Sequence, residues 1–407
     1  MLPHRIVDIL IRHFELFVIR TPVGLRKMAR WPLIFEDVYK ISTRSMRLNC
    51  SHPFIADRNK FWLIKVILFR FIALVCFIFL LNSIICHDVK GKKYTEAIKN
   101  GIMAIVAVTV TFKHGILVHR HRAIKDLIKL IDRDYKLAEA LSSEEKTIIL
   151  YYVEKGVQIC RFWLVAAGLT SLMFPIKALV LMAQHCLKDE CVLIPMFDFT
   201  YPKAINEYKD ILSVFCATFL MCISFDLYSM SVYIGFDPLV PIFMLHTCGQ
   251  LDLLSRNLSK ALKEMSKVVI CIFLQIVKLY REFLIYRFVK NVQKIFVILY
   301  EFNMKTTTFL IPFSSLRNKE ITIEFISFFF GAILHFYVPC YYSNLLMSES
   351  LRQAIYACGW EMESDLQIRK TILLMLTRTS APLVIKTVFY PICLDTFAEV
   401  FVFNLHY

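Results

Sequence analysis

The chain has 407 residues, of which 57% are hydrophobic, including 35 Phe and 18 Tyr, and its mean hydropathy is +0.56. A soluble domain carries roughly 45–50% apolar residues, so this composition excludes an ordinary soluble protein. The 10 Gly and 13 Pro are too few for the many turns of a β-barrel, whose strands alternate apolar and polar residues. We therefore predict an all-α membrane protein.

The formal net charge of +15 could indicate a nucleic-acid partner. No nucleic-acid-binding motif accompanies the basic residues, which lie between apolar blocks, so we predict contact with membrane lipid and no nucleic acid. The 13 Cys lie mostly inside apolar stretches and form no CxxC pair. The sequence predicts neither a metal site nor a cofactor.

The first twenty residues interrupt every short apolar run with His, Arg, Asp or Glu, so they lack the apolar core of a signal peptide. Their apolar residues recur at helical spacing, which predicts an amphipathic helix lying either on the membrane or on the protein itself. Residues 1–60 are expected to form a cytoplasmic N-terminal segment of a single seven-helix transmembrane domain, 1–407.

Seven apolar stretches approach the roughly 20 residues that a helix needs to cross a bilayer. The second is short, and charges interrupt the fifth. The predicted spans lie near residues 61–86, 101–118, 162–183, 207–235, 291–313, 321–347 and 378–403.

Lys and Arg concentrate in alternate loops, which predicts the orientation of the chain because positive loops stay in the cytoplasm. The segment before the first span and every second loop hold 31 of these residues, and the remaining loops hold 8. We therefore expect a cytoplasmic N-terminus and, after seven spans, an extracellular C-terminus. The sequons at Asn49 and Asn257 would both lie inside, where no glycan is added.

Two long inside segments, 119–161 and 236–290, continue helical patterns beyond the membrane. Each carries an apolar stripe that must be buried, against other subunits or within the same chain. The stripes are formed by Ile124, Leu127, Ile128, Ile131 and Tyr135, and by Leu251, Leu254, Leu258 and Leu262.

Charged residues inside spans are the usual indication of function, because an unpaired charge in a bilayer is costly. The seventh span holds Arg378, Lys386, Asp395 and Glu399, so one of its faces lines either an ion pathway or an internal network of salt bridges. Asp226 in the fourth span raises the same question. In the fifth span, Glu301 and Lys305 are spaced to neutralise each other.

No catalytic motif occurs in the chain, and we predict no catalytic residue and no enzyme. The outer halves of the second, third, fourth and sixth spans are rich in Phe, Met, Ile and Val, which suits a cavity for a small apolar molecule. Cys186 and Cys191 in the second outer loop either form a disulfide or remain thiols.

The C-terminal third resembles the insect odorant receptors. The resemblance rests on motifs in the family's order: Cys340-Tyr341-Tyr342, Glu349-Ser350, Ala354-Ile355-Tyr356, Trp360, Arg378, Pro382-Leu383 and Leu394-Asp395-Thr396-Phe397. Asp237-Pro238-Leu239 and His246 resemble the family's pattern after the fourth span. The chain departs from the family at Asn404–Tyr407, where a Ser-Tyr-Ser-like step and further apolar residues usually follow.

This resemblance implies an odorant receptor: the ligand-tuned subunit of a heteromeric, odorant-gated cation channel, expected to be a tetramer formed with a common co-receptor. The plasma membrane of olfactory sensory neurons is the expected location. It implies a volatile apolar ligand among the second, third, fourth and sixth spans, near Ile105, Val108, Phe174, Met182, Phe215, Phe219, Phe325 and Phe329.

The same resemblance assigns residues 236–403 to a cytoplasmic anchor and a pore helix. Asp395, Glu399 and Val400 are the pore candidates, and Tyr356 and Trp360 are candidates for the anchor between subunits. The alternatives are a gustatory-type channel and a G-protein-coupled receptor, which would need the opposite orientation.

Overall fold

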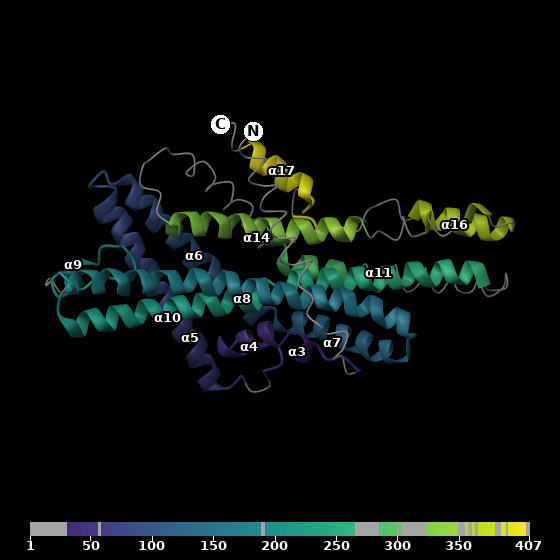
Figure 1. Ribbon diagram of the computed structural model, residues 1–407, viewed down its shortest axis with the longest axis horizontal. Coiled ribbons are helices and arrows are strands. Elements are labelled where there is room, and N and C mark those ends of the chain that lie inside the picture. The colour runs from purple at the N-terminus through teal and green to yellow at the C-terminus, as the bar shows by residue number, and fades with distance from the viewer. Residues whose placement is uncertain are drawn as a thin grey trace.

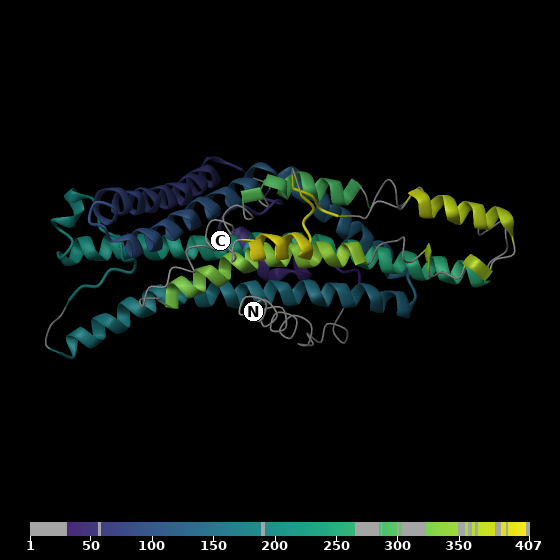
Figure 2. The same ribbon diagram turned by 90° about the horizontal axis from the view of Figure 1, so that it is seen from above.

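The computed structural model describes residues 31–55, 58–188, 192–264, 285, 287–298, 301–302, 323–348, 355–356, 360–362, 365–378, 384–387 and 390–403. These residues fold almost entirely into helices. The long helices α8, α10, α11 and α14 run along the longest axis of the molecule (Figure 1). The end of α11 and helix α16 extend away from the end where α9 lies, as the view from above also shows (Figure 2).

Within the described residues, four helical segments are long and apolar enough to cross a membrane, which confirms the first four predicted spans: Lys60–Asp88, Tyr94–His119, Ser143–Cys186 and Leu212–Asn257. They comprise α5 (Lys60–Asn82) with the π-helix η1 (Ser83–Asp88), α6 (Tyr94–His119), α8 (Ser143–Cys186), α10 (Leu212–Phe236) and the first part of α11 (Leu239–Glu264). The second span is longer than predicted, because α6 continues through the polar residues that precede residue 101.

The later spans match the prediction in part. Helix α14 (Ile323–Ser348) coincides with the sixth span. Of the fifth span, residues 291–298 and 301–302 are helical, and the remainder, with Lys305, lies outside the described residues.

The prediction of one continuous helix over 378–403 is wrong. Helix α16 (Leu366–Arg378) ends where that span was to begin, Lys386 and Pro391 form an isolated β-bridge, and α17 (Leu394–Phe403) begins only afterwards. Pro391 has no N–H to donate and disfavours a helical conformation of the residue before it. A helix that continued through this point would therefore lose a backbone hydrogen bond.

The shorter helices are α3 (Phe35–Val38), α4 (Lys40–Leu48), α7 (His121–Leu137), the 3-10 turn η2 (Ala138–Ala140), α9 (Lys203–Asn206) and η4 (Trp360–Met362), of which α3, α4 and α7 lie beside the long helices (Figure 1). The stripe of α7 predicted from Ile124 to Tyr135 is fully buried in the main core. For this helix the alternative of packing within the chain is therefore the observed one.

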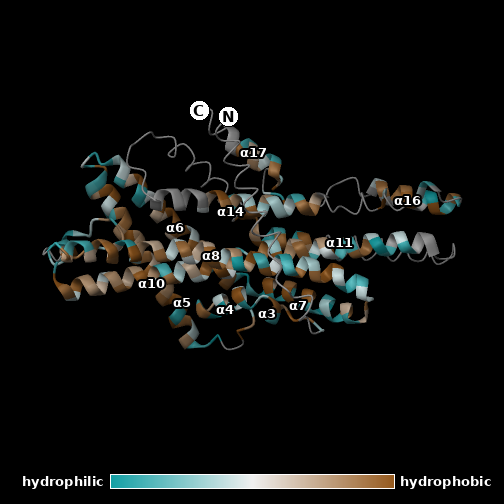
Figure 3. Ribbon diagram, viewed as in Figure 1, coloured by the Kyte–Doolittle hydropathy of each residue, from teal (hydrophilic) through white to brown (hydrophobic). Residues whose placement is uncertain are grey.

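Two apolar cores organise the molecule. The larger joins α3, α4, α7, α8, α11, α14 and α17, and the smaller joins α5, α6 and α10 to the segment 196–201. Figure 3 shows hydrophobic residues dominating α5, α6 and α10, whereas hydrophilic residues are frequent on α7, α11 and α16. The apolar end is the part suited to a bilayer, and the mixed end is suited to water.

Two close approaches hold α4 and α3 against the long helices. Ser42 and Ser45 of α4 each donate a hydrogen bond of 2.8 Å to a carbonyl of α10, those of Gly235 and Ser231. At Gly156 of α8, the ring of Tyr39 lies so near that an added Cβ would be 2.8 Å from it. These contacts need small or hydroxyl-bearing residues at the interface.

Candidate ligand-binding site

A cavity of about 420 Å³ lies between α6, α8, α10 and α14. Its walls are mainly apolar and include Ile105, Met173, Phe174, Phe225 and Leu334. Pockets that bind small molecules measure roughly 300–1,000 Å³ and combine apolar walls with a few placed polar groups. The cavity therefore has the size and lining of a site for a small apolar ligand.

The four helices that form the cavity are those of the predicted second, third, fourth and sixth spans. Of the eight predicted pocket residues, Ile105 and Phe174 line it. Val108 instead lines a separate groove between α5 and α6, and neither Met182 nor Phe215 nor Phe219 is among the described lining residues. Phe325 and Phe329 lie in α14, where their side chains are outside the described part of the structure.

The hydroxyl groups around the cavity are largely bonded to their own helices. Thr109 donates to the carbonyl of Ile105 at 2.8 Å, and Ser229 donates to that of Phe225 at 2.8 Å. Such bonds within a helix turn leave these hydroxyls little capacity as donors toward a ligand.

Asp226 is the carboxyl group of the cavity wall. Its Oδ2 accepts a hydrogen bond of 2.6 Å from Ser171 of α8. None of the described lining residues is Lys or Arg, and the imidazole of His335 bonds to Asp237 instead of to this group. The sequence left open whether Asp226 lines a pathway or joins an internal network, and a serine hydroxyl is its partner in the structure.

A buried ionic cluster lies at one end of the cavity. Lys113 Nζ is 2.6 Å from Asp237 Oδ1, and the two side chains are 0% and 7% exposed. His335, which also lines the cavity, places Nε2 3.0 Å from Asp237 Oδ2 and Nδ1 2.6 Å from the carbonyl of Gly331. The cluster ties α6, the end of α10 and α14 together.

Aromatic rings enclose this cluster on the cavity side. The ring of His335 lies 4.7 Å from that of Trp163 and 4.9 Å from that of Tyr233, and Lys113 Nζ lies 4.5 Å from the Tyr233 ring. Sequence reasoning missed this arrangement, although Lys113 is a basic residue within a predicted span and could have been noted for that reason. The partners are 124 and 98 positions apart, so no local pattern joins them.

The predicted pore residues lie on α17. Asp395 and Glu399 are exposed and one helical turn apart, whereas Val400 is half-buried against the main core. In the predicted anchor, Tyr356 is 63% exposed and Trp360 is half-buried against the same core. The predicted disulfide alternative involves Cys191, which lies outside the described residues.

The comparisons with known proteins agree with the helical fold described above. No curated protein sequence matches the chain. Among solved structures, the fold is similar to that of the insect olfactory receptor OR5 from Machilis hrabei in complex with eugenol, with a TM-score of 0.68, 14% identity, and coverage of 91% of this chain and 96% of that one.

A second structure of OR5 from Machilis hrabei gives a TM-score of 0.65 at 16% identity, covering 95% of this chain and 97% of that one. At such identities the likeness concerns the fold. The sequence of residues 93–403 matches the family described as 7tm Odorant receptor. Because that match spans most of the chain, this protein belongs to the 7tm odorant receptor family.

Proposed function

We propose that this odorant receptor is the ligand-binding subunit of an odorant-gated, non-selective cation channel, formed as a heteromer with a common co-receptor in the plasma membrane of olfactory sensory neurons. The observation that carries the proposal is the cavity between α6, α8, α10 and α14, whose described walls are apolar apart from a few polar groups, with Asp226 as their one carboxyl group. A ligand enclosed there would contact four helices at once, so its binding would favour one packing of these helices over another.

Family membership confirms the coarser predictions: a seven-helix all-α membrane protein that is a receptor and not an enzyme. The proposed orientation, with the N-terminus in the cytoplasm, rests on the bias of Lys and Arg between loops. Asn49, the acceptor of the first sequon, is fully buried and so favours neither orientation.

The proposed pore is lined by the face of α17 that carries Asp395 and Glu399. Both side chains are exposed, and acidic residues that line a pore favour cations. Val400 packs on the body of the same subunit, so only one face of α17 is left for a neighbour or for water. The proposed subunit anchor comprises α11 and α16 with Tyr356 and Trp360, at the end of the molecule away from the cavity.

The test is whole-cell current from cells that express this chain with a compatible co-receptor, challenged with a panel of volatile compounds that includes eugenol. The co-receptor alone is the control. We expect a ligand-evoked cation current that requires this chain. If the chain reaches the cell surface and no compound evokes such a current while a related receptor responds in parallel, the proposed channel function is wrong.

A cavity-filling variant links the current to the site. Gly331 lines the cavity, and an added Cβ there meets nothing within 4 Å, so Gly331→Leu would occupy ligand space without a clash in the backbone. Gly168 on α8 is equally open and is not among the described lining residues, which makes Gly168→Leu the matched control. We expect Gly331→Leu to lose the response, and Gly168→Leu to keep it at equal surface expression.

A further inference from the structure

Asp226 is the carboxyl group among the described lining residues of the cavity, and a purely apolar ligand would leave it unused. The carboxyl group lies among side chains such as Met173, Phe174 and Phe225, where an acceptor without a donor costs free energy. Ser171 donates to Oδ2, and a carboxyl group offers about four acceptor positions on its two oxygens. Most of its accepting capacity is therefore left for a molecule inside the cavity.

The surroundings of Asp226 also indicate that its accepting capacity is left for a ligand. The hydroxyls of Thr109 and Ser229 are bonded to their own helices, and His335 faces Asp237 and the carbonyl of Gly331. No Lys or Arg occurs among the described residues of the wall. His335 is the basic side chain among the described lining residues, and its two ring nitrogens are engaged by Asp237 and Gly331, so Asp226 presents an acceptor that favours a donor or a positive charge on the ligand.

We propose that Asp226 selects for a small apolar ligand carrying one hydrogen-bond donor, either a hydroxyl or an ammonium group, with the donor directed at the carboxyl group and the apolar part against α6 and α14. This proposal rests on the proposed function of the cavity and specifies its ligand class. A site built to bond a donor discriminates strongly against an analogue that lacks it, because the buried acceptor is then left unsatisfied.

The experiment uses pairs of ligands that differ in the donor alone. An alcohol, the amine of the same carbon skeleton and the corresponding methyl ether are tested on the chain with its co-receptor, and eugenol is compared with its O-methyl ether. The donor-bearing members should act at concentrations lower by about tenfold to about a hundredfold. If the ethers are as potent as the donors while current is evoked, the proposal is overturned and the proposed channel function is not.

Variants at Asp226 separate the two donor classes. Asp226→Asn keeps an acceptor oxygen and removes the charge, so an alcohol should remain within a few-fold of its original potency, whereas an amine should lose about tenfold or more. Asp226→Leu should abolish the preference over the ether for both. Asp210→Asn, an exposed acid just before α10, makes the same chemical change outside the cavity and should leave the preference unchanged.

A binding measurement keeps the test independent of channel opening and of variants that fail to fold. Trp163 lines the cavity, so its fluorescence reports occupancy of the purified chain in detergent, with Trp163→Phe identifying its signal among the four Trp. Titration with the alcohol and ether pair should show tighter binding of the alcohol to the unmodified chain. Equal binding of the two would overturn the proposal even where no current is recorded.

Discussion

The pair formed by Lys113 and Asp237 joins α6 to the junction of α10 and α11, and both charges are removed from solvent. Burying two ions costs several kcal/mol each, which their attraction and the bond from His335 offset only while both partners are present. The pair is therefore a weak source of stability and a strong constraint on how the helices pack.

Lys113→Met should destabilise the protein by about 3–5 kcal/mol, because Asp237 is left charged and buried without its cation. The second change in Lys113→Met/Asp237→Leu should restore part of this loss, since no charge is then stranded. Thermal unfolding in detergent measures both. Lys177→Met, which breaks a partly exposed ion pair with Asp198, should cost no more than about 1 kcal/mol. Equal costs at the two lysines would contradict the argument.

His52 introduces a dependence on pH outside the membrane-spanning helices. Burial lowers the pKa of its imidazole, with Glu36 opposing this and Arg47 adding to it. Nδ1 accepts from the backbone N–H of Phe54, which also requires the neutral ring. Because the folded pKa lies below the unfolded one, the unfolded chain binds the proton more readily, and stability falls as the pH drops from above the unfolded value toward the folded one.

We therefore expect the melting temperature to fall when the pH is lowered through about 6.5. His52→Gln should flatten this dependence. The melting temperature measured from pH 7.5 to 5 in one detergent tests it, with His185→Gln on the half-buried end of α8 as the control. An unchanged pH profile in His52→Gln would show that another group is responsible.

Among the elements, α8 depends on a close approach by Tyr39 that the sequence of α8 alone does not predict. Gly156 lies in the middle of this helix, where glycine costs up to about 1 kcal/mol relative to alanine. The ring of Tyr39 occupies the space that a Cβ would need, and Tyr39 is held further by Tyr135, whose hydroxyl is 3.3 Å from its own. The glycine is thus required by packing and opposed by helix propensity.

Gly156→Ala should consequently destabilise the protein by about 1–3 kcal/mol, because overpacking exceeds the gain in propensity. Gly101→Ala on α6, where an added Cβ meets nothing within 4 Å, should be neutral or stabilising by up to about 1 kcal/mol. Unfolding in denaturant distinguishes the two. Stabilisation by both substitutions would mean that Tyr39 moves aside without cost.

The elements also show what a sequence can predict. The stripe of α7 was predicted correctly because its spacing of apolar residues is a local pattern, and the first four spans because length and hydropathy decide them. The prediction of a continuous seventh helix was wrong because it followed the hydropathy of the segment and disregarded Pro391, which interrupts the helical hydrogen bonds. The start of α6 was missed by several residues, since polar residues can extend a helix beyond the bilayer, whereas α10 begins at Leu212, later than the predicted residue 207.

In the candidate site, the walls were predictable and most of the contacts were not. Ile105 and Phe174 line the cavity as expected, whereas Met182, Phe215 and Phe219 do not lie among its described residues. A residue within the correct helix faces the cavity or turns away from it according to helix rotation, which tertiary packing sets. The joining of Lys113, Asp237 and His335 depends on contacts between distant segments, which a single sequence does not encode in a local pattern.

For the whole molecule, the proposed pore gives a prediction that needs the assembled channel. Glu399→Gln should reduce the ratio of Ca²⁺ to Na⁺ permeability by roughly twofold or more, because an acidic ring favours the divalent ion. Reversal potentials under bi-ionic conditions measure this ratio. Glu144→Gln, at the exposed start of α8, removes one charge far from α17 and should leave the ratio unchanged. If neither variant changed the permeability ratio, the residues that select between Ca²⁺ and Na⁺ would lie elsewhere.

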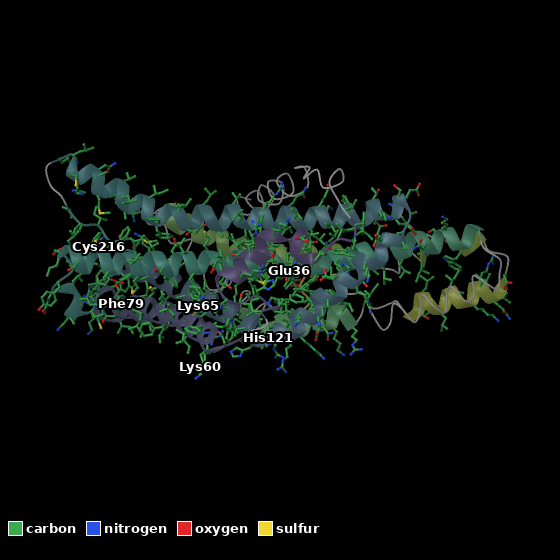
Figure 4. The ribbon with its side chains drawn as sticks, turned by 90° about the horizontal axis from the view of Figure 1, so that it is seen from below. Glu36, Lys60, Lys65, Phe79, His121 and Cys216 are labelled. Carbon is green, nitrogen blue, oxygen red and sulfur yellow. The ribbon has the colours of Figure 1, made fainter. Side chains whose placement is uncertain are left out.

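The length of helix α8 determines how far a tilt at the cavity displaces its other end. It supplies Trp163, Ser171 and Phe174 to the cavity and continues without interruption to Ser142, where a capping box closes its other end. Figure 4 shows the side chains from below, with Glu36 and His121 labelled near the middle of the molecule. From Ser171 to Glu145 the helix rises roughly 39 Å, so a tilt of about 2° about the cavity displaces the far end by about 1.4 Å.

Such a displacement exceeds the gap at which packed side chains lose much of their attraction. Because α8 is one continuous helix, a small tilt at the ligand site displaces its other end, and this displacement increases with the length of the helix. The movement required of a ligand is then far smaller than the movement delivered to the helices that pack on α8 at the opposite end, among them α11.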